Sequence, residues 1–188
     1  MYLVSGILMA LHHACRTGLG QVIDMAMVDG VAHMMSAFQA MLQGGMWSEE
    51  RMANSVDGGS PDYGVYTAAD GKFIAVGAME PQFYAALLAL LDIDVSTVPS
   101  RDDRANWPEL RSLFAARFAT RNRAEWLELA EGKDICISPV LSISEAWNHP
   151  HMVERGSFRH FAGRLHPAPA PRLSATPGGG DASDSSGG

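Results

Sequence analysis

The stretch Lys72-Phe-Ile-Ala-Val-Gly-Ala-Met-Glu-Pro-Gln-Phe-Tyr84 decides the fold, because its pattern changes from that of a strand to that of a helix. Residues 73–76 form a short apolar run rich in side chains that favour strands. Beyond it, apolar residues recur at three- and four-residue spacing, which predicts a helix: Phe83, Leu87, Leu90 and Leu91. Pro81 suits the first helical position, where a missing N–H costs nothing. We therefore expect Glu80 at the junction, near the N-terminus of the helix.

Glu80 has two interpretations at this junction. A carboxylate there faces free N–H groups and the positive end of the helix dipole, so it could act as a helix cap. Glu is a weak capping residue, however, and the same position suits a functional acid or base. The local pattern leaves both interpretations of Glu80 open.

Just upstream of the strand, Asp70-Gly71 is a hairpin turn signal. This turn is expected to join a first strand at residues 65–67 to the strand at residues 73–76.

Several short motifs occur in a defined order along the chain. Gly20-Gln-Val-Ile-Asp-Met-Ala-Met-Val-Asp-Gly30, Asp57-Gly-Gly-Ser-Pro-Asp-Tyr63 and Gly77-Ala-Met-Glu-Pro-Gln-Phe-Tyr84 come first. His149-Pro-His-Met-Val-Glu-Arg-Gly156 and Pro169-Ala-Pro-Arg172 follow. In this order and at this spacing they resemble the α-methylacyl-CoA racemase branch of the family III CoA-transferase (CaiB/BaiF) superfamily. The resemblance runs from Met1 to about Ser174 and covers the C-terminal part of the family pattern.

The resemblance implies an α/β protein with a partial large Rossmann-like domain and a small α+β domain. We expect residues 1–46 to belong to the large domain, 47–61 to be a linker, and 62–155 to form the small domain. Residues 156–174 would return to the large domain. Residues 175–188 are Ser- and Gly-rich and are expected to be a disordered tail.

Local patterns predict the remaining elements. They are a helix over residues 2–11 ended by Gly18, a buried strand over Gln21 to Met27, and a helix capped by Asp29 and closed by Gly44-Gly45. Further helices are expected to begin at Trp107-Pro108, at Asn122 and at Ser144. An edge strand is expected over residues 135–141, because Pro139 interrupts this apolar run. The run Arg101-Asp-Asp-Arg104 is expected to be solvated.

Composition argues against several classes of function. The 188 residues carry a net charge of −7, with Lys72 and Lys133 as the two lysines, which argues against a nucleic-acid partner. The apolar segment 2–11 is too short to span a bilayer and lacks the flanks of a signal peptide. Cys15 and Cys136 have no disulfide or metal-ligand spacing, and the seven histidines form no ligand pair. We expect a cytoplasmic protein with no metal, membrane or nucleic-acid partner.

Two groups of residues are candidates for substrate binding. Six methionines lie between Met25 and Met46; they could fill a core or accept flexible acyl chains. The resemblance places Met25, Met27 and Met79 on an acyl-binding surface. Gly58 and Gly59 would permit close approach of the backbone to a ligand, or would simply form a tight turn. By resemblance, this loop approaches the thioester near Glu80, and Tyr63 contacts it.

The chemistry implied by the resemblance is inversion of the α-carbon of a 2-methylacyl-CoA thioester. A proton leaves one face and another is delivered to the opposite face, which requires two acid/base groups. Glu80 matches one. The other, a His–Asp pair, precedes Met1 in the family pattern, so we expect this chain to be inactive alone. CoA enters only as part of the substrate, and the complete protein is expected to be an interlocked homodimer.

Two other functions remain open. A CoA-transferase of the same superfamily would move CoA between carboxylic acids with an upstream Asp as acyl acceptor, although Glu80-Pro81 favours the racemase. A non-catalytic interaction fragment would instead bind an N-terminal half in trans. The DNA upstream of the Met1 codon discriminates among these functions.

Overall fold

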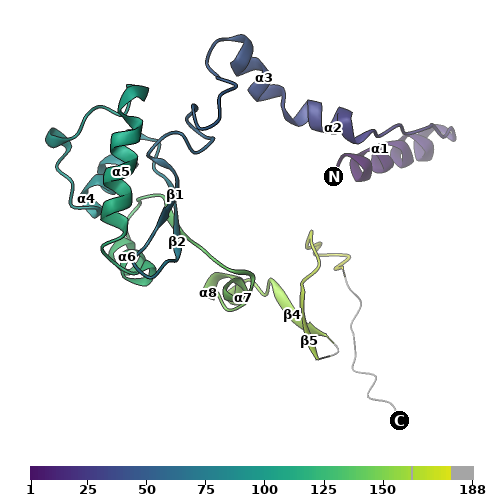
Figure 1. Ribbon diagram of the computed structural model, residues 1–188. Coiled ribbons are helices and arrows are strands. Elements are labelled where there is room, and N and C mark those ends of the chain that lie inside the picture. The colour runs from purple at the N-terminus through teal and green to yellow at the C-terminus, as the bar shows by residue number, and fades with distance from the viewer. Residues whose placement is uncertain (162, 179–188) are drawn as a thin grey trace. The chain divides into compact units, whose positions relative to one another are not determined.

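The computed structural model describes residues 1–161 and 163–178, so most of the tail predicted over residues 175–188 lies outside the described residues. The chain divides into two compact units. Unit 1 consists of Met1–Gly64 and Val98–Ser112, and unit 2 of Val65–Thr97 and Leu113–Gly188. Figure 1 shows the elements in chain order. None of the described helices is long and apolar enough to cross a membrane.

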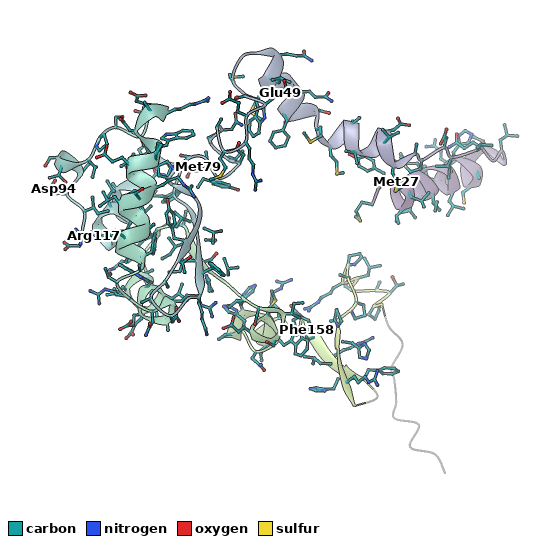
Figure 2. All side chains as sticks on the ribbon, in the orientation of Figure 1. Met27, Glu49, Met79, Asp94, Arg117 and Phe158 are labelled. Carbon is teal, nitrogen blue, oxygen red and sulfur yellow. The ribbon has the colours of Figure 1, made fainter. Side chains whose placement is uncertain are left out.

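Three helices begin unit 1. They are α1 (Tyr2–Thr17), α2 (Met27–Met34) and α3 (Ser36–Gln43). The predicted end of α1 is confirmed: Gly18 adopts a left-handed φ of 73°, and its N–H donates to the Ala14 carbonyl at 2.8 Å. Side chains on these helices are largely exposed, as Met27 at the start of α2 shows (Figure 2).

The strand predicted over Gln21 to Met27 is wrong. This segment is irregular, the Val22 side chain is 95% exposed, and α2 already begins at Met27. Residues 1–62 are all described and contain no strand. A strand is stable only when a neighbouring strand pairs with its backbone groups, and nothing in this segment provides that partner.

The single helix predicted after Asp29 is also wrong in two details. Ala26, not Asp29, is the N-terminal cap of α2, and Asp29 lies inside its first turn. The helix then stops, and α3 restarts after Met35. At this break the Ser36 hydroxyl donates to the His33 carbonyl. Such a side-chain bond competes with the helical backbone and accounts for the interruption.

A three-stranded sheet contains the stretch that opened the sequence analysis. Its strands are β1 (Tyr63–Thr67), β2 (Phe73–Gly77) and β3 (Ile137–Val140), in the order β1-β2-β3. The predicted hairpin is confirmed by the bond from the Ala68 N–H to the Lys72 carbonyl at 2.8 Å. β3 runs antiparallel to β2, with Val76 opposite Ile137. As predicted, β3 is an edge strand, which explains why it tolerates Pro139.

Helices α4 (Pro81–Leu90), α5 (Trp107–Phe118) and α6 (Arg123–Ala130) gather around this sheet (Figure 1). Their predicted apolar faces form the core. Phe118 stacks on Tyr66 of β1 at 5.0 Å and meets Trp126 of α6 edge-on at 5.4 Å between ring centroids. Ile74 and Leu87 are fully buried. Each such side chain contributes about 1.5–3 kcal/mol to stability.

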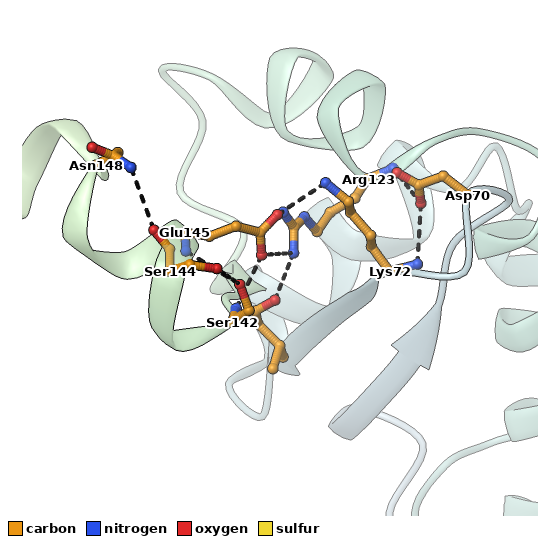
Figure 3. Close-up of polar contacts among 8 residues, drawn as sticks. Asp70, Lys72, Arg123, Ser142, Ser144, Glu145 and Asn148 are labelled. Atoms are coloured by element: carbon orange, nitrogen blue, oxygen red, sulfur yellow. Dashed lines mark hydrogen bonds and ion pairs between the residues drawn. The ribbon is translucent and has the colours of Figure 1, made fainter.

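A polar cluster ties the end of β3 to helix α7 (Ile143–Trp147) (Figure 3). The Glu145 carboxylate accepts hydrogen bonds from the Arg123 guanidinium at 2.6 Å and from the Lys72 ammonium at 2.9 Å. Arg123 also donates to the Val140 carbonyl at 2.6 Å, and its side chain is only 10% exposed. The cluster thus joins the turn between β1 and β2 to α6, to the end of β3 and to α7.

The last described elements are α8 (Pro150–Glu154) and a hairpin of β4 (Phe158–Phe161) with β5 (Arg164–Pro167). His149 caps α8 and Pro150 occupies its first turn, which confirms the helix start predicted there. The hairpin is antiparallel, with Phe158 opposite Pro167, and was not predicted. The 3₁₀ turns Val95–Thr97 and Arg104–Asn106 complete the structure.

Candidate active site at Glu80

Glu80 lies where β2 leads into α4, as predicted. It is the N-cap residue of α4, with φ −70° and ψ 146°, and Pro81 follows at the first helical position. Its main-chain carbonyl accepts the first helical bond, from the Tyr84 N–H at 2.9 Å. Within the described part of the chain its side chain makes no capping hydrogen bond, and the residue is exposed. The carboxylate is therefore not used to cap α4.

The sheet brings a thiol into the surroundings of Glu80. The Gly77 N–H at the end of β2 donates to the Cys136 carbonyl at 2.9 Å, which aligns the two segments. Burial raises the pKa of the Cys136 thiol, and the negative charges of Asp134 and Glu80 raise it further. Glu80 is thus close enough to influence a thiol that stays protonated at neutral pH. No sequence signal identified Cys136, because its position depends on strand register.

Met79 directly precedes Glu80 in the segment between β2 and α4. Ala78 is fully buried, whereas Met79 is 37% exposed. Met79, which precedes Glu80 in the chain, is therefore partly exposed where its other neighbour, Ala78, is buried. This position leaves the thioether surface accessible to an apolar ligand.

The glycine-rich loop of unit 1 is shaped by contacts within itself. A Cβ on Gly59 would lie 2.3 Å from the Met52 carbonyl oxygen, so this glycine accommodates the chain's own backbone. Gly58 has a φ of 92°, a conformation that favours glycine. Tyr63 follows at the start of β1 and is 38% exposed. Gly58 and Gly59 thus lie in the loop itself, and the partly exposed Tyr63 begins the strand that follows it.

Asp57 organises the same loop. Its carboxylate accepts hydrogen bonds from the buried Asn54 side chain at 2.8 Å and from the Gly59 N–H at 3.0 Å. Burial raises the pKa of Asp57, but bonds from the Asn54 side chain and from the Gly59, Asn54 and Ala53 N–H groups lower it overall. The loop is therefore held by a carboxylate that remains ionised. The linker predicted over residues 47–61 contains this network, which the sequence did not reveal.

The expectation that the run 101–104 is solvated is wrong for Arg101. Its guanidinium forms an ion pair with Asp62, whose side chain is only 6% exposed, and the Ser60 hydroxyl donates to the same carboxylate. The Arg101 carbonyl in turn accepts from the Trp107 indole N–H at 2.7 Å. Burial of the Asp62 carboxylate is unfavourable without a compensating charge. The Arg101 guanidinium supplies that charge and is therefore not fully solvated.

A cavity of about 650 Å³ lies beside this loop, within unit 1. Gly59, Met52, Arg104, Trp107 and Arg111 are among the residues that line it. The Arg104 guanidinium stacks over the Trp107 ring at 5.6 Å, and Arg111 donates to the Ser60 carbonyl at 3.3 Å. Both cations thus help to fix the cavity wall.

Met25 and Met27 have different surroundings. The Met25 methyl group lies 3.2 Å from the position of a Cβ on Gly30, so this half-buried side chain covers the face of α2. Met27 is 88% exposed.

Met79 and Glu80 belong to unit 2, whereas the other predicted residues belong to unit 1. In the part of the chain that is described, no group of three His, Cys, Asp or Glu residues is arranged to hold a metal ion.

The chain has a mixed helix-and-strand fold that is similar to those of solved CaiB/BaiF family proteins. A CaiB/BaiF family protein from Brucella suis matches it with a TM-score of 0.71 and 24% identity, over 94% of this chain and 47% of that structure. The family model for CoA-transferase family III matches residues 1–183, and the chain belongs to this family.

Two curated relatives are named alpha-methylacyl-CoA racemase. The chain is 46% identical to the Mus musculus protein and 43% identical to the Homo sapiens protein, over 173 residues in each case. The matches cover 92% of this chain but 45% of each relative. The chain therefore spans about half the length of the curated relatives it matches.

Proposed function

We propose that this chain forms the C-terminal part of a racemase that inverts the α-carbon of 2-methylacyl-CoA thioesters. Glu80 is one of its two acid/base groups. The observation that carries the proposal is an exposed carboxylate that its own helix does not use as a cap, at the start of α4. The 46% identity to a protein named as such a racemase supports the choice of reaction.

Glu80 would exchange one proton with the substrate. Glu80 has a defined main-chain position as the N-cap residue before Pro81, which would help to orient its carboxylate toward C2 of the thioester. Removal of the C2 proton gives an enolate, whose oxygen needs preorganised hydrogen-bond donors. Inversion then requires a second group on the opposite face. We assign that group to the part of the family fold that lies outside the matched half.

The remaining predicted residues have supporting roles in this proposal. Met79, beside Glu80, would contact the acyl chain, together with the exposed Met27 and the half-buried Met25. The loop that contains Gly58 and Gly59 would approach the thioester, with Tyr63 as its contact. CoA takes part only as the carrier of the acyl group. The complete protein would be an interlocked homodimer.

A chimera tests the role of Glu80. This chain replaces the matched part of the mouse racemase, and the chimera is incubated with a 2-methylacyl-CoA in deuterated water. We expect Glu80→Gln to lower deuterium wash-in at C2 by roughly 10²–10⁴-fold, because the amide keeps the size of the side chain but cannot take a proton. Thioester binding, measured by calorimetry, should change little.

Glu131→Gln is the matched control. Glu131 is an exposed glutamate that follows α6 in the same unit, so its removal changes the net charge equally. This variant should exchange deuterium at the parent rate. Exchange at the parent rate by the Glu80→Gln chimera would disprove the assignment of Glu80.

A further inference from the structure

The segment from His149 to Arg172 is cationic within an acidic chain. It carries four arginines and a single glutamate, a net charge of +3, while the whole chain carries −7. The arginines are Arg155, Arg159, Arg164 and Arg172. Such a reversal of charge creates a local positive potential that attracts anions.

Two of these arginines line one cavity. This cavity, of about 330 Å³, is formed by Arg155, Ser157, Arg172 and residues 168–171. Two hydrogen bonds to main-chain carbonyl groups fix the segments that form this cavity. The Gly156 carbonyl accepts from the Arg172 guanidinium at 2.8 Å, and the Ser157 carbonyl accepts from the Ala168 N–H at 2.9 Å.

The positive charges in this cavity are not neutralised. No carboxylate is among its lining residues. Within the described residues, every ion pair involves other cations, namely Lys72, Arg101 and Arg123. Arg172 bonds only to a neutral carbonyl there, and Arg155 has no carboxylate within pairing distance. Two arginines that line one cavity, with no carboxylate among the lining residues, favour binding of an anion.

We propose that the cavity between Arg155 and Arg172 binds a phosphate group. A guanidinium is a planar fork of donors that matches phosphate oxygens in pairs, and a phosphate has enough oxygens to serve two such forks. A carboxylate has only two oxygens. Ser157, which carries a hydroxyl, also lines the cavity. The phosphate comes either from free phosphate or from a phosphate ester of CoA, and this site is independent of the racemase chemistry.

Calorimetric titration of the 188-residue chain with inorganic phosphate, in phosphate-free buffer at low salt, tests the site. We expect saturable binding that weakens at least about tenfold in Arg155→Gln and in Arg172→Gln, because each loses a charge-assisted hydrogen bond. Arg159→Gln is the matched control. Arg159 lies on β4 of the same segment and is exposed, but it does not line the cavity, so binding should change less than about twofold.

Further arms identify the source of the phosphate and exclude a folding artefact. Tighter binding of CoA than of dephospho-CoA indicates the ribose phosphate ester, whereas equal binding of both and of inorganic phosphate indicates free phosphate. Arg172→Lys, which keeps the charge, should retain part of the affinity, and circular dichroism should show unchanged unfolding in Arg155→Gln. Absence of saturable binding, or equal loss in all three glutamine variants, overturns the proposal. No turnover is measured, so the result does not depend on Glu80.

Discussion

Single charged residues determine how the sheet of unit 2 is joined to the helices that follow it. Glu145 accepts hydrogen bonds from Arg123, from the Ser142 N–H and from Lys72, and these bonds, with Arg123 the largest contributor, hold the pKa of Glu145 well below its ordinary value of 4.5. Arg123 is buried, and Glu145 is the one carboxylate that its guanidinium contacts among the described residues. Ionised Glu145 is therefore the charge that makes burial of Arg123 tolerable.

The stability of unit 2 should follow the ionisation of Glu145. Because the pKa of Glu145 is lower in the folded state, its contribution is complete above the unfolded value of 4.5 and is lost as the pH falls toward the folded pKa. Glu145→Gln should lower the urea midpoint at pH 7, and the gap from the parent chain should narrow steadily below pH 4.5. Glu131→Gln, which removes an exposed charge, is the control. A gap that is constant from pH 7 to pH 3 would contradict this explanation.

At the scale of elements, the loop before β1 is ordered by close contacts between main-chain segments. Gly59 lies against the carbonyl groups of Met52 and Asn54, and Asp57 bonds to three N–H groups around it. The loop is irregular in its dihedral angles, yet its buried polar groups have partners. The sequence predicted a glycine-rich loop here, but it did not predict the contacts that order the loop.

Substitution of Gly59 tests this account of the loop. The added Cβ of Gly59→Ala would meet the Met52 carbonyl oxygen at 2.3 Å, a backbone contact that side-chain motion cannot relieve. We expect a loss of roughly 1–3 kcal/mol and faster hydrogen exchange at the Ala53 and Gly59 amides. Gly20→Ala is the control, since nothing lies within 4 Å of its Cβ position. Equal exchange in both variants would show that the loop does not depend on this contact.

At the scale of the whole molecule, apolar surface is distributed unevenly. Unit 2 has a core of buried aromatic and aliphatic side chains, whereas α1 has no buried residue. Leu3, Leu8 and Met9 on α1 are each more than half exposed. Apolar area of this extent favours association, because contact removes it from water.

The isolated chain should therefore self-associate. Sedimentation velocity over a range of concentrations should show species larger than the 20.2 kDa monomer. Leu8→Lys, on a side chain that is 60% exposed, should weaken the association by placing a charge on the apolar face. Ser5→Lys adds the same charge at an exposed polar position and should have a smaller effect. A monomeric parent chain at all concentrations would contradict this prediction.

The sequence by itself determined the elements whose signals are local. The strand-to-helix change at Glu80, the end of α1 at Gly18 and the start of α8 at Pro150 all match the structure. Each depends on dihedral preferences and hydrogen bonds within about four residues, which a single window of sequence contains. The order of motifs likewise identified the family that the comparisons confirm.

Only the tertiary structure decided the features that depend on distant partners. The segment at Val22 has strand-like residues but no neighbouring strand, so it stays irregular. Arg101 forms an ion pair with Asp62 and is not fully exposed to solvent. The Cys136 carbonyl accepts a hydrogen bond from the Gly77 N–H, and this contact places Cys136 near Glu80. The cavity between Arg155 and Arg172 likewise depends on the pairing of β4 with β5, two strands that lie between these arginines in the sequence. These contacts join residues 17 to 59 positions apart, and pairing over such separations is set by packing and register, which local propensity does not encode.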